Sequence, residues 1–141
     1  MSPLLATHLA LAAGYAGLQW TVWGLVYAQF AEVPAGAWPA FHDGHGRRIA
    51  RLVGPLFAGQ LVTTGWLLLT RPPGTPPAAL LCGAVCLAVV LLVTGLIAVP
   101  QHRRLTDGFD AVVHARLLRA DSVRVAAATG GVLAAGWAAL G

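Results

Sequence analysis

The charged residues divide the apolar positions of the chain into four long stretches. No Asp, Glu, Lys or Arg precedes Glu32, none lies between Arg51 and Arg71 or between Arg71 and Arg103, and none follows Arg124. A membrane-spanning helix needs about 20 consecutive, mostly apolar residues. Such stretches fold as helices because unpaired backbone groups are very unfavourable in hydrocarbon. The pattern therefore predicts four membrane-spanning helices, over about residues 4–30, 49–70, 78–99 and 123–141.

The connections between these stretches predict how the helices are arranged. Residues 71–77 are rich in proline and predict a tight turn. Short connections join antiparallel neighbours, so we expect a single all-α domain over residues 1–141, an integral membrane up-down four-helix bundle. The first stretch has no basic segment before it, unlike a signal peptide, and we expect it to be retained. Pro55 lies inside the second stretch and predicts a kink or a widened turn.

Composition and charge indicate the class of protein and its orientation in the membrane. The chain is 57% apolar and only 10% charged, with a mean hydropathy of +0.72, which argues against a water-soluble enzyme. Arginines flank the connections at residues 31–48 and 100–124, and only Arg71 lies elsewhere. Positively charged connections stay in the cytoplasm, so we expect a plasma-membrane protein with cytoplasmic connections and both termini external. The same arginines explain the net charge of +4, so the expected partner is the lipid bilayer and not nucleic acid.

Histidines are concentrated in the two predicted cytoplasmic connections, which contain His42, His45, His102 and His114. His42 and His45 are three residues apart and share a face of any helix that begins near Pro39. We expect the four imidazoles to meet at the cytoplasmic mouth of the bundle and to hold a transition metal, copper or iron. The alternative is that the four rings simply lie at the level of the lipid headgroups.

Carboxylates in the same connections are candidates for a supporting role. Asp43 and Asp107 are expected to orient the metal ligands and so to take part in catalysis.

Polar residues also occur inside the first two stretches. Tyr15, Gln19 and Trp23 recur at helical spacing along one face of the first helix, and Gln60 lies at a similar depth in the second. A hydrogen bond between Gln19 and Gln60 is therefore expected. These residues either join the helices or line a substrate path. If they line a substrate path, we expect Tyr15 and Gln19 to take part in catalysis and Trp23 and Gln60 to contact the substrate.

Two further groups of side chains suggest binding. Arg116 and Arg119, with the nearby Arg124, either bind an anionic headgroup or a substrate carboxylate, or serve only to set the topology. Cys82 and Cys86 are four residues apart and either hold a soft metal ion or pack as small apolar residues.

Several short segments resemble a known group of proteins. They are Gln29–Pro34 (QFAEVP), Phe41–His45 (FHDGH), Val99–Leu105 (VPQHRRL) and the arginine-rich start of the fourth stretch. Together they resemble small four-span bacterial membrane proteins and, more remotely, the anthrone oxygenase-like group. Those relatives carry an Asn before the arginine of the fourth span, where this chain has Asp121, Ser122 and Arg124. The resemblance implies an oxidative, oxygen-using activity on a small organic molecule.

The function predicted from these features is that of a membrane-embedded, metal-dependent oxidoreductase acting on a small organic substrate. Two alternatives stay open. One is a non-catalytic scaffold or a subunit of a larger transport or redox complex, which would bind another membrane protein. The other is a carrier of a small solute, for which four helices would have to form a homo-oligomer.

Overall fold

The computed structural model describes residues 2–141, and within that range it contains helices and no strands. The elements are α1 (Pro3–Thr21), η1 (Val22–Val26), η2 (Ala28–Glu32), η3 (Ala35–Ala37), α2 (Trp38–Thr70), α3 (Pro77–Val93), η4 (Thr94–Ala98), α4 (Val99–Arg104) and α5 (Ala111–Leu140). Of the short elements, η1 and η4 are π-helical turns, and η2 and η3 are 3₁₀ turns. The prediction of an all-α fold is confirmed.

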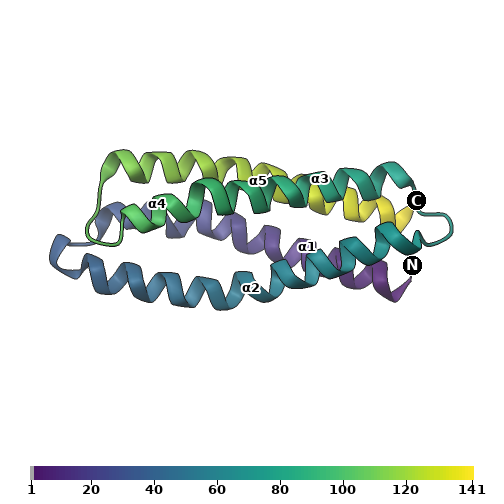
Figure 1. The fold of residues 1–141 in the computed structure, drawn as a ribbon, viewed down its shortest axis with the longest axis horizontal. Coiled ribbons are helices and arrows are strands. Elements are labelled where there is room, and N and C mark those ends of the chain that lie inside the picture. The colour runs from purple at the N-terminus through teal and green to yellow at the C-terminus, as the bar shows by residue number, and fades with distance from the viewer. Residues whose placement is uncertain (1) are drawn as a thin grey trace.

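These elements join into four long segments, over Pro3–Glu32, Ala35–Thr70, Pro77–Arg104 and Ala111–Leu140. Each is long and apolar enough to cross a membrane. Figure 1 shows the segments side by side along the length of the molecule, with both chain termini at the same end. The turn between α2 and α3 lies at this end, and the connections at residues 33–34 and 105–110 lie at the opposite end, which we call the loop end.

Two helices begin well before the apolar stretches that predicted them. The second helix begins at Trp38 and not near residue 49, with Pro39 in its first turn, where a missing N–H is harmless. The helix α5 begins at Ala111 and not near residue 123, because Asp110 caps it and accepts hydrogen bonds from the backbone N–H groups of Val112 and Val113. Residues 38–48 and 111–122, which were predicted to belong to connections, are therefore helical.

Widened turns occur at places that the sequence did not suggest. The helix α2 is α-helical throughout, including Pro55, so the widened turn expected there is absent. Instead η1 and η4 add an extra residue to one turn each, shortly before Tyr27 and His102. Such π turns change which side chains face the interior and are frequent near functional sites.

The helices are packed unevenly. The helix α5 packs extensively against α3 and α1, whereas α2 packs mainly against α1. At the loop end a buried cluster joins all four segments; its members are Val22, Tyr27, Phe30, Trp38, Ala98, Leu105 and Leu117. This cluster holds the start of α2 beside α4 and so positions the histidines of both helices.

Candidate functional site

Three of the four predicted histidines come together at the loop end. His42 and His45 lie in the first turns of α2, and His102 lies in α4. The Nε2 atom of His42 is 3.2 Å from Nδ1 of His102, and the ring centroids of His45 and His102 are 6.1 Å apart. The predicted helix beginning near Pro39 is confirmed, and it is the reason that both α2 imidazoles reach the same place.

Aromatic rings fix the positions of these imidazoles. The ring of Trp38 stacks on His42 with a centroid distance of 5.3 Å, and its Nε1–H donates a 2.6 Å hydrogen bond to the carbonyl oxygen of Leu105. Phe30, which is fully buried, lies 5.0 Å from the ring of His45. The α2 histidines are thus held by the core cluster of the loop end and do not project freely into water.

The fourth predicted histidine has a different environment. The Nε2 atom of His114 forms a 2.8 Å hydrogen bond with the carbonyl oxygen of Tyr27, and its ring contacts Phe30 and Phe109. In the part of the chain that the structure describes, no ring contact joins His114 to another imidazole. His114 therefore ties α5 to the end of η1 and is not beside the other three histidines.

The geometry does not supply a complete set of metal ligands. Both ring nitrogens of His102 already have partners, because Nε2 lies 2.8 Å from the Tyr27 hydroxyl and Nδ1 faces His42. Asp43 pairs with Arg47 at the surface, and Asp107 is exposed in the loop after α4. Over residues 2–141, no three His, Cys, Asp or Glu side chains are placed to hold a metal ion.

One nitrogen in this region has no partner. His45 Nε2 is buried and forms no hydrogen bond with any residue that the structure describes. Because this atom is buried and His45 does not line the cavity described below, a complete metal site would require His45 and His102 to reorient. We derive no chemical step through a metal from this arrangement.

A cavity of about 370 Å³ opens beside the histidines, between α2 and the η4–α4 segment. Such a volume lies within the range of small-molecule sites. The cavity walls include Ile49, Val53 and Ala98, and its polar lining includes Tyr27, His42, His102 and Arg124. The weak packing of α2 against this part of the molecule leaves the space that the cavity occupies.

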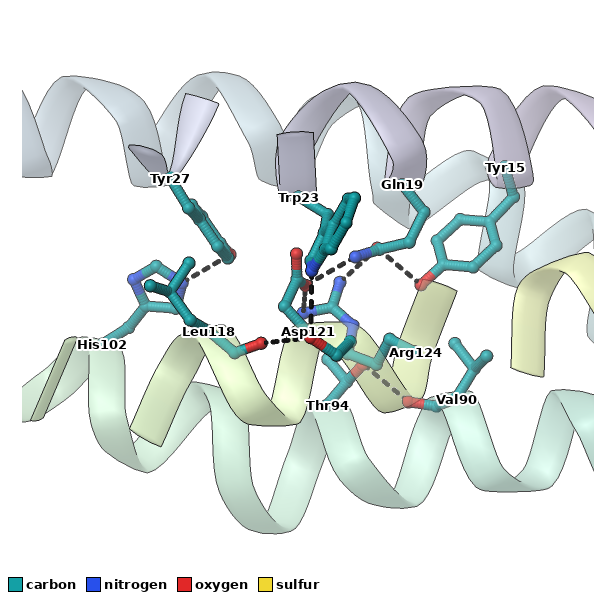
Figure 2. A network of polar contacts seen from close by, with 11 residues as sticks. Tyr15, Gln19, Trp23, Tyr27, Val90, Thr94, His102, Leu118, Asp121 and Arg124 are labelled. Atoms are coloured by element: carbon teal, nitrogen blue, oxygen red, sulfur yellow. Dashed lines mark hydrogen bonds and ion pairs between the residues drawn. The ribbon is translucent and has the colours of Figure 1, made fainter. Parts of the chain in front are cut away.

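A buried polar network lies next to the cavity, and Figure 2 shows it beside Tyr27 and His102. The hydroxyl of Tyr15 and Nη2 of Arg124 donate to Gln19 Oε1 at 3.0 and 2.8 Å. Gln19 Nε2 donates to Asp121 Oδ1 at 2.5 Å, and the same oxygen is 3.3 Å from Arg124 Nη1. Asp121 is fully buried and Arg124 is 6% exposed. The two opposite charges therefore stabilise each other in the interior.

The network corrects one expectation about the polar residues of the first helix. Tyr15 and Gln19 do line the interior together, but the expected hydrogen bond between Gln19 and Gln60 is wrong. Gln60 instead donates a 3.4 Å bond to the backbone of Leu56. Gln19 turns to Asp121 and Arg124, which the sequence analysis had placed in a connection. The N-cap signal of Asp110, followed by helix-forming residues, was the clue that α5 begins early enough to bury them.

Of the predicted site residues, only His42, His102 and Arg124 line the cavity. Trp23 is 38% exposed and donates from Nε1 to Ser122 Oγ at 2.9 Å. Arg116 and Arg119 are exposed on α5, beside a surface groove that includes Val93 and Ile97. Cys82 and Cys86 are free thiols in α3. This helix begins at the end of the molecule opposite the histidine cluster. None of these five side chains lines the cavity between α2 and α4.

No family model, curated protein or solved structure matches this sequence.

Proposed function

We propose that the protein crosses the plasma membrane four times as an up-down bundle, with the loop end in the cytoplasm and both termini outside. The four long apolar segments support the crossings. The arginines that flank the loop end support the orientation, because positively charged flanks remain cytoplasmic.

Within this bundle the protein acts as an oxidoreductase on a small organic molecule that enters the cavity between α2 and α4. The observation that carries the proposal is the cavity itself, where two imidazoles and a phenol meet apolar walls. An apolar pocket with a few convergent polar groups is the usual form of a small-molecule site. A substrate dissolved in the bilayer would reach it through the gap beside α2.

The side chains of the cavity are suited to proton transfer. His42, His102 and the hydroxyl of Tyr27 form a continuous hydrogen-bonded row, with separations of 3.2 and 2.8 Å. An imidazole can accept a proton from a substrate O–H or activated C–H group and pass it along such a row. His42 is the proposed general base, because both ring nitrogens of His102 already have partners; His102 continues the row, and Tyr27 orients it. The oxidative part of the proposal, with dioxygen as the oxidant, is supported by the resemblance to the anthrone oxygenase-like group.

Dioxygen uptake tests this function. Purified protein in liposomes is supplied with a panel of small phenols and naphthols, and uptake is compared with that of empty liposomes. Val53→Trp fills the cavity and should abolish the protein-dependent uptake, while Leu52→Trp, on the exposed face of the same helix, should leave it unchanged. Equal uptake with and without protein for every compound, or full activity in Val53→Trp, would overturn the proposal.

A second candidate is a copper- or iron-dependent form of this activity, which the unpartnered Nε2 of His45 favours. His42, His45 and His102 are the residues that would hold the ion, and its contribution would be redox chemistry at the cavity mouth. Elemental analysis of the purified protein should find about one equivalent of copper or iron. His45→Ala should lose it and His114→Ala should keep it. Metal-free protein after reconstitution with either ion would exclude this candidate.

The scaffold, subunit and carrier functions remain predictions that purification can separate from an enzyme. A subunit should copurify with another membrane protein in mild detergent, whereas an enzyme of the proposed kind should be isolated alone or as a homo-oligomer.

A further inference from the structure

We infer that the cavity between α2 and α4 binds organic anions, with an anionic oxygen of the ligand held by the guanidinium of Arg124. The inference rests on the proposed small-molecule function of the cavity and adds the chemical class of the ligand. Two independent observations support it: an unpaired donor on Arg124, and the charges of the cavity lining.

The first observation is an unsatisfied hydrogen-bond donor. The Nη1 and Nη2 atoms of Arg124 face Asp121 and Gln19, but its Nε is buried and has no hydrogen-bond partner within residues 2–141. Arg124 itself is 6% exposed and lines the cavity. A buried N–H group without an acceptor is unfavourable, and a charged donor gains most from an anionic acceptor. Arg124 lines the cavity, so an anionic ligand there can supply that acceptor once the guanidinium turns toward it, because Nε itself has no exposed surface.

The second observation is the charge of the lining. Arg124 and Arg103 both contribute to it, whereas no Asp or Glu of residues 2–141 does. Asp121, which partly neutralises Arg124, is fully buried behind it and does not reach the cavity. Electrostatic attraction is stronger in an apolar, weakly screening environment, so the lining favours a negative ligand.

The shape of the cavity defines the rest of the ligand. Ile49, Val53 and Ala98 provide apolar walls next to the two arginines. Arg103 is exposed, so its charge lies at the rim, where it can attract an anion from the headgroup region. The ligand that fits both features has an apolar body and a carboxylate, or another single anionic oxygen.

A matched pair of probes tests this inference without requiring turnover. The binding of 2-naphthoate and of its neutral analogue 2-naphthamide is measured by equilibrium dialysis with the protein in phosphatidylcholine nanodiscs, and binding to empty nanodiscs is subtracted. We expect 2-naphthoate to bind about tenfold more tightly than 2-naphthamide, as a charge-assisted hydrogen bond would provide.

Variants test whether the arginines cause the preference for 2-naphthoate over 2-naphthamide. Arg124→Lys keeps a positive charge for Asp121 but lacks Nε, and it should lose most of the preference for 2-naphthoate while binding 2-naphthamide as before. Because Arg124 is buried and its replacement can impair folding, Arg103→Gln at the rim provides a second readout and should reduce the preference severalfold. Arg104→Gln is the matched control, because Arg104 is exposed beside Arg103 but does not line the cavity, and it should leave the preference unchanged.

The outcomes separate this inference from the function on which it rests. Equal binding of both probes to the wild-type protein would overturn the anion preference while leaving a ligand-binding cavity. Binding of neither probe to the wild-type protein would overturn the proposed small-molecule site and the inference together. A preference that survives in both Arg124→Lys and Arg103→Gln would show that the arginines do not recognise the anion.

Discussion

Two ion pairs of similar sequence spacing lie in very different surroundings. Asp43 and Arg47 pair on the first turns of α2, where their side chains are 61% and 62% exposed. Asp121 and Arg124 pair inside the molecule, joined by Gln19. An exposed pair contributes at most about 1 kcal/mol, because water screens it. Removing one partner of a buried pair leaves an uncompensated charge in an apolar environment.

This contrast predicts the effect of deleting each acid. Asp121→Leu should lower the free energy of unfolding by about 3–5 kcal/mol, whereas Asp43→Ala should change it by less than about 1 kcal/mol. Reversible unfolding of the detergent-solubilised protein measures both. The double variant Asp121→Leu/Arg124→Met should regain much of the lost stability, since it removes both charges. A mild effect of Asp121→Leu would mean that the pair is not buried as described.

For individual residues, the sequence predicted which side chains are candidates for a site more readily than which hydrogen-bond partners they have. The histidines of α2 and α4 were identified because four imidazoles are conspicuous in so apolar a chain. The hydrogen-bond partner of Gln19 was not identified, because an amide can pair with any polar group at the same depth in the bundle. Only the rotation of the neighbouring helices about their axes selects one of these groups. Asp121 and Arg124 look like ordinary boundary charges until the start of α5 is known.

At the level of elements, the start of α5 has the largest consequences. Asp110 caps the helix by accepting from Val112 and Val113, and this moves the first turn ahead of the apolar stretch. As a result His114, Asp121 and Arg124 become buried helical residues.

Replacing the cap tests this account. Asp110→Ala should destabilise the protein by about 1 kcal/mol and should increase hydrogen exchange at the first turn of α5, because two N–H groups lose their acceptor. Asp107→Ala is the matched control in the same loop and should change neither quantity, since Asp107 is exposed and caps no helix. A stability loss confined to Asp107→Ala would reverse these assignments.

Across the whole molecule, the packing is strong on one side and open on the other. The helix α5 packs closely against both α1 and α3, and the loop-end cluster ties the start of α2 to them. The cavity lies where α2 departs from the η4–α4 segment. An opening on this side suits a ligand that arrives from the bilayer, which is the route proposed here.

Thiol labelling tests the proposed orientation of the whole molecule. With Cys82 and Cys86 replaced by Ala, a single cysteine is placed at Pro73, in the turn between α2 and α3, or at Asp107, at the loop end. A membrane-impermeant maleimide should label Pro73→Cys on intact cells and Asp107→Cys only after permeabilisation, because the proposed orientation puts the arginine-rich end in the cytoplasm. The opposite pattern would invert the topology.

The sequence alone determined the all-helical fold, the four long apolar segments and the placement of four histidines near one end. These follow from hydropathy, charge and helical spacing, which act locally along the chain. Only the tertiary structure decided that His114 bonds to Tyr27, that Gln19 joins Asp121 and Arg124, and that a cavity opens beside His42 and His102. These features depend on two π turns, on an N-cap and on how tightly each pair of helices packs. Only the N-cap at Asp110 leaves a local signal in the sequence. The other causes are contacts between residues far apart in the sequence, which no local pattern encodes.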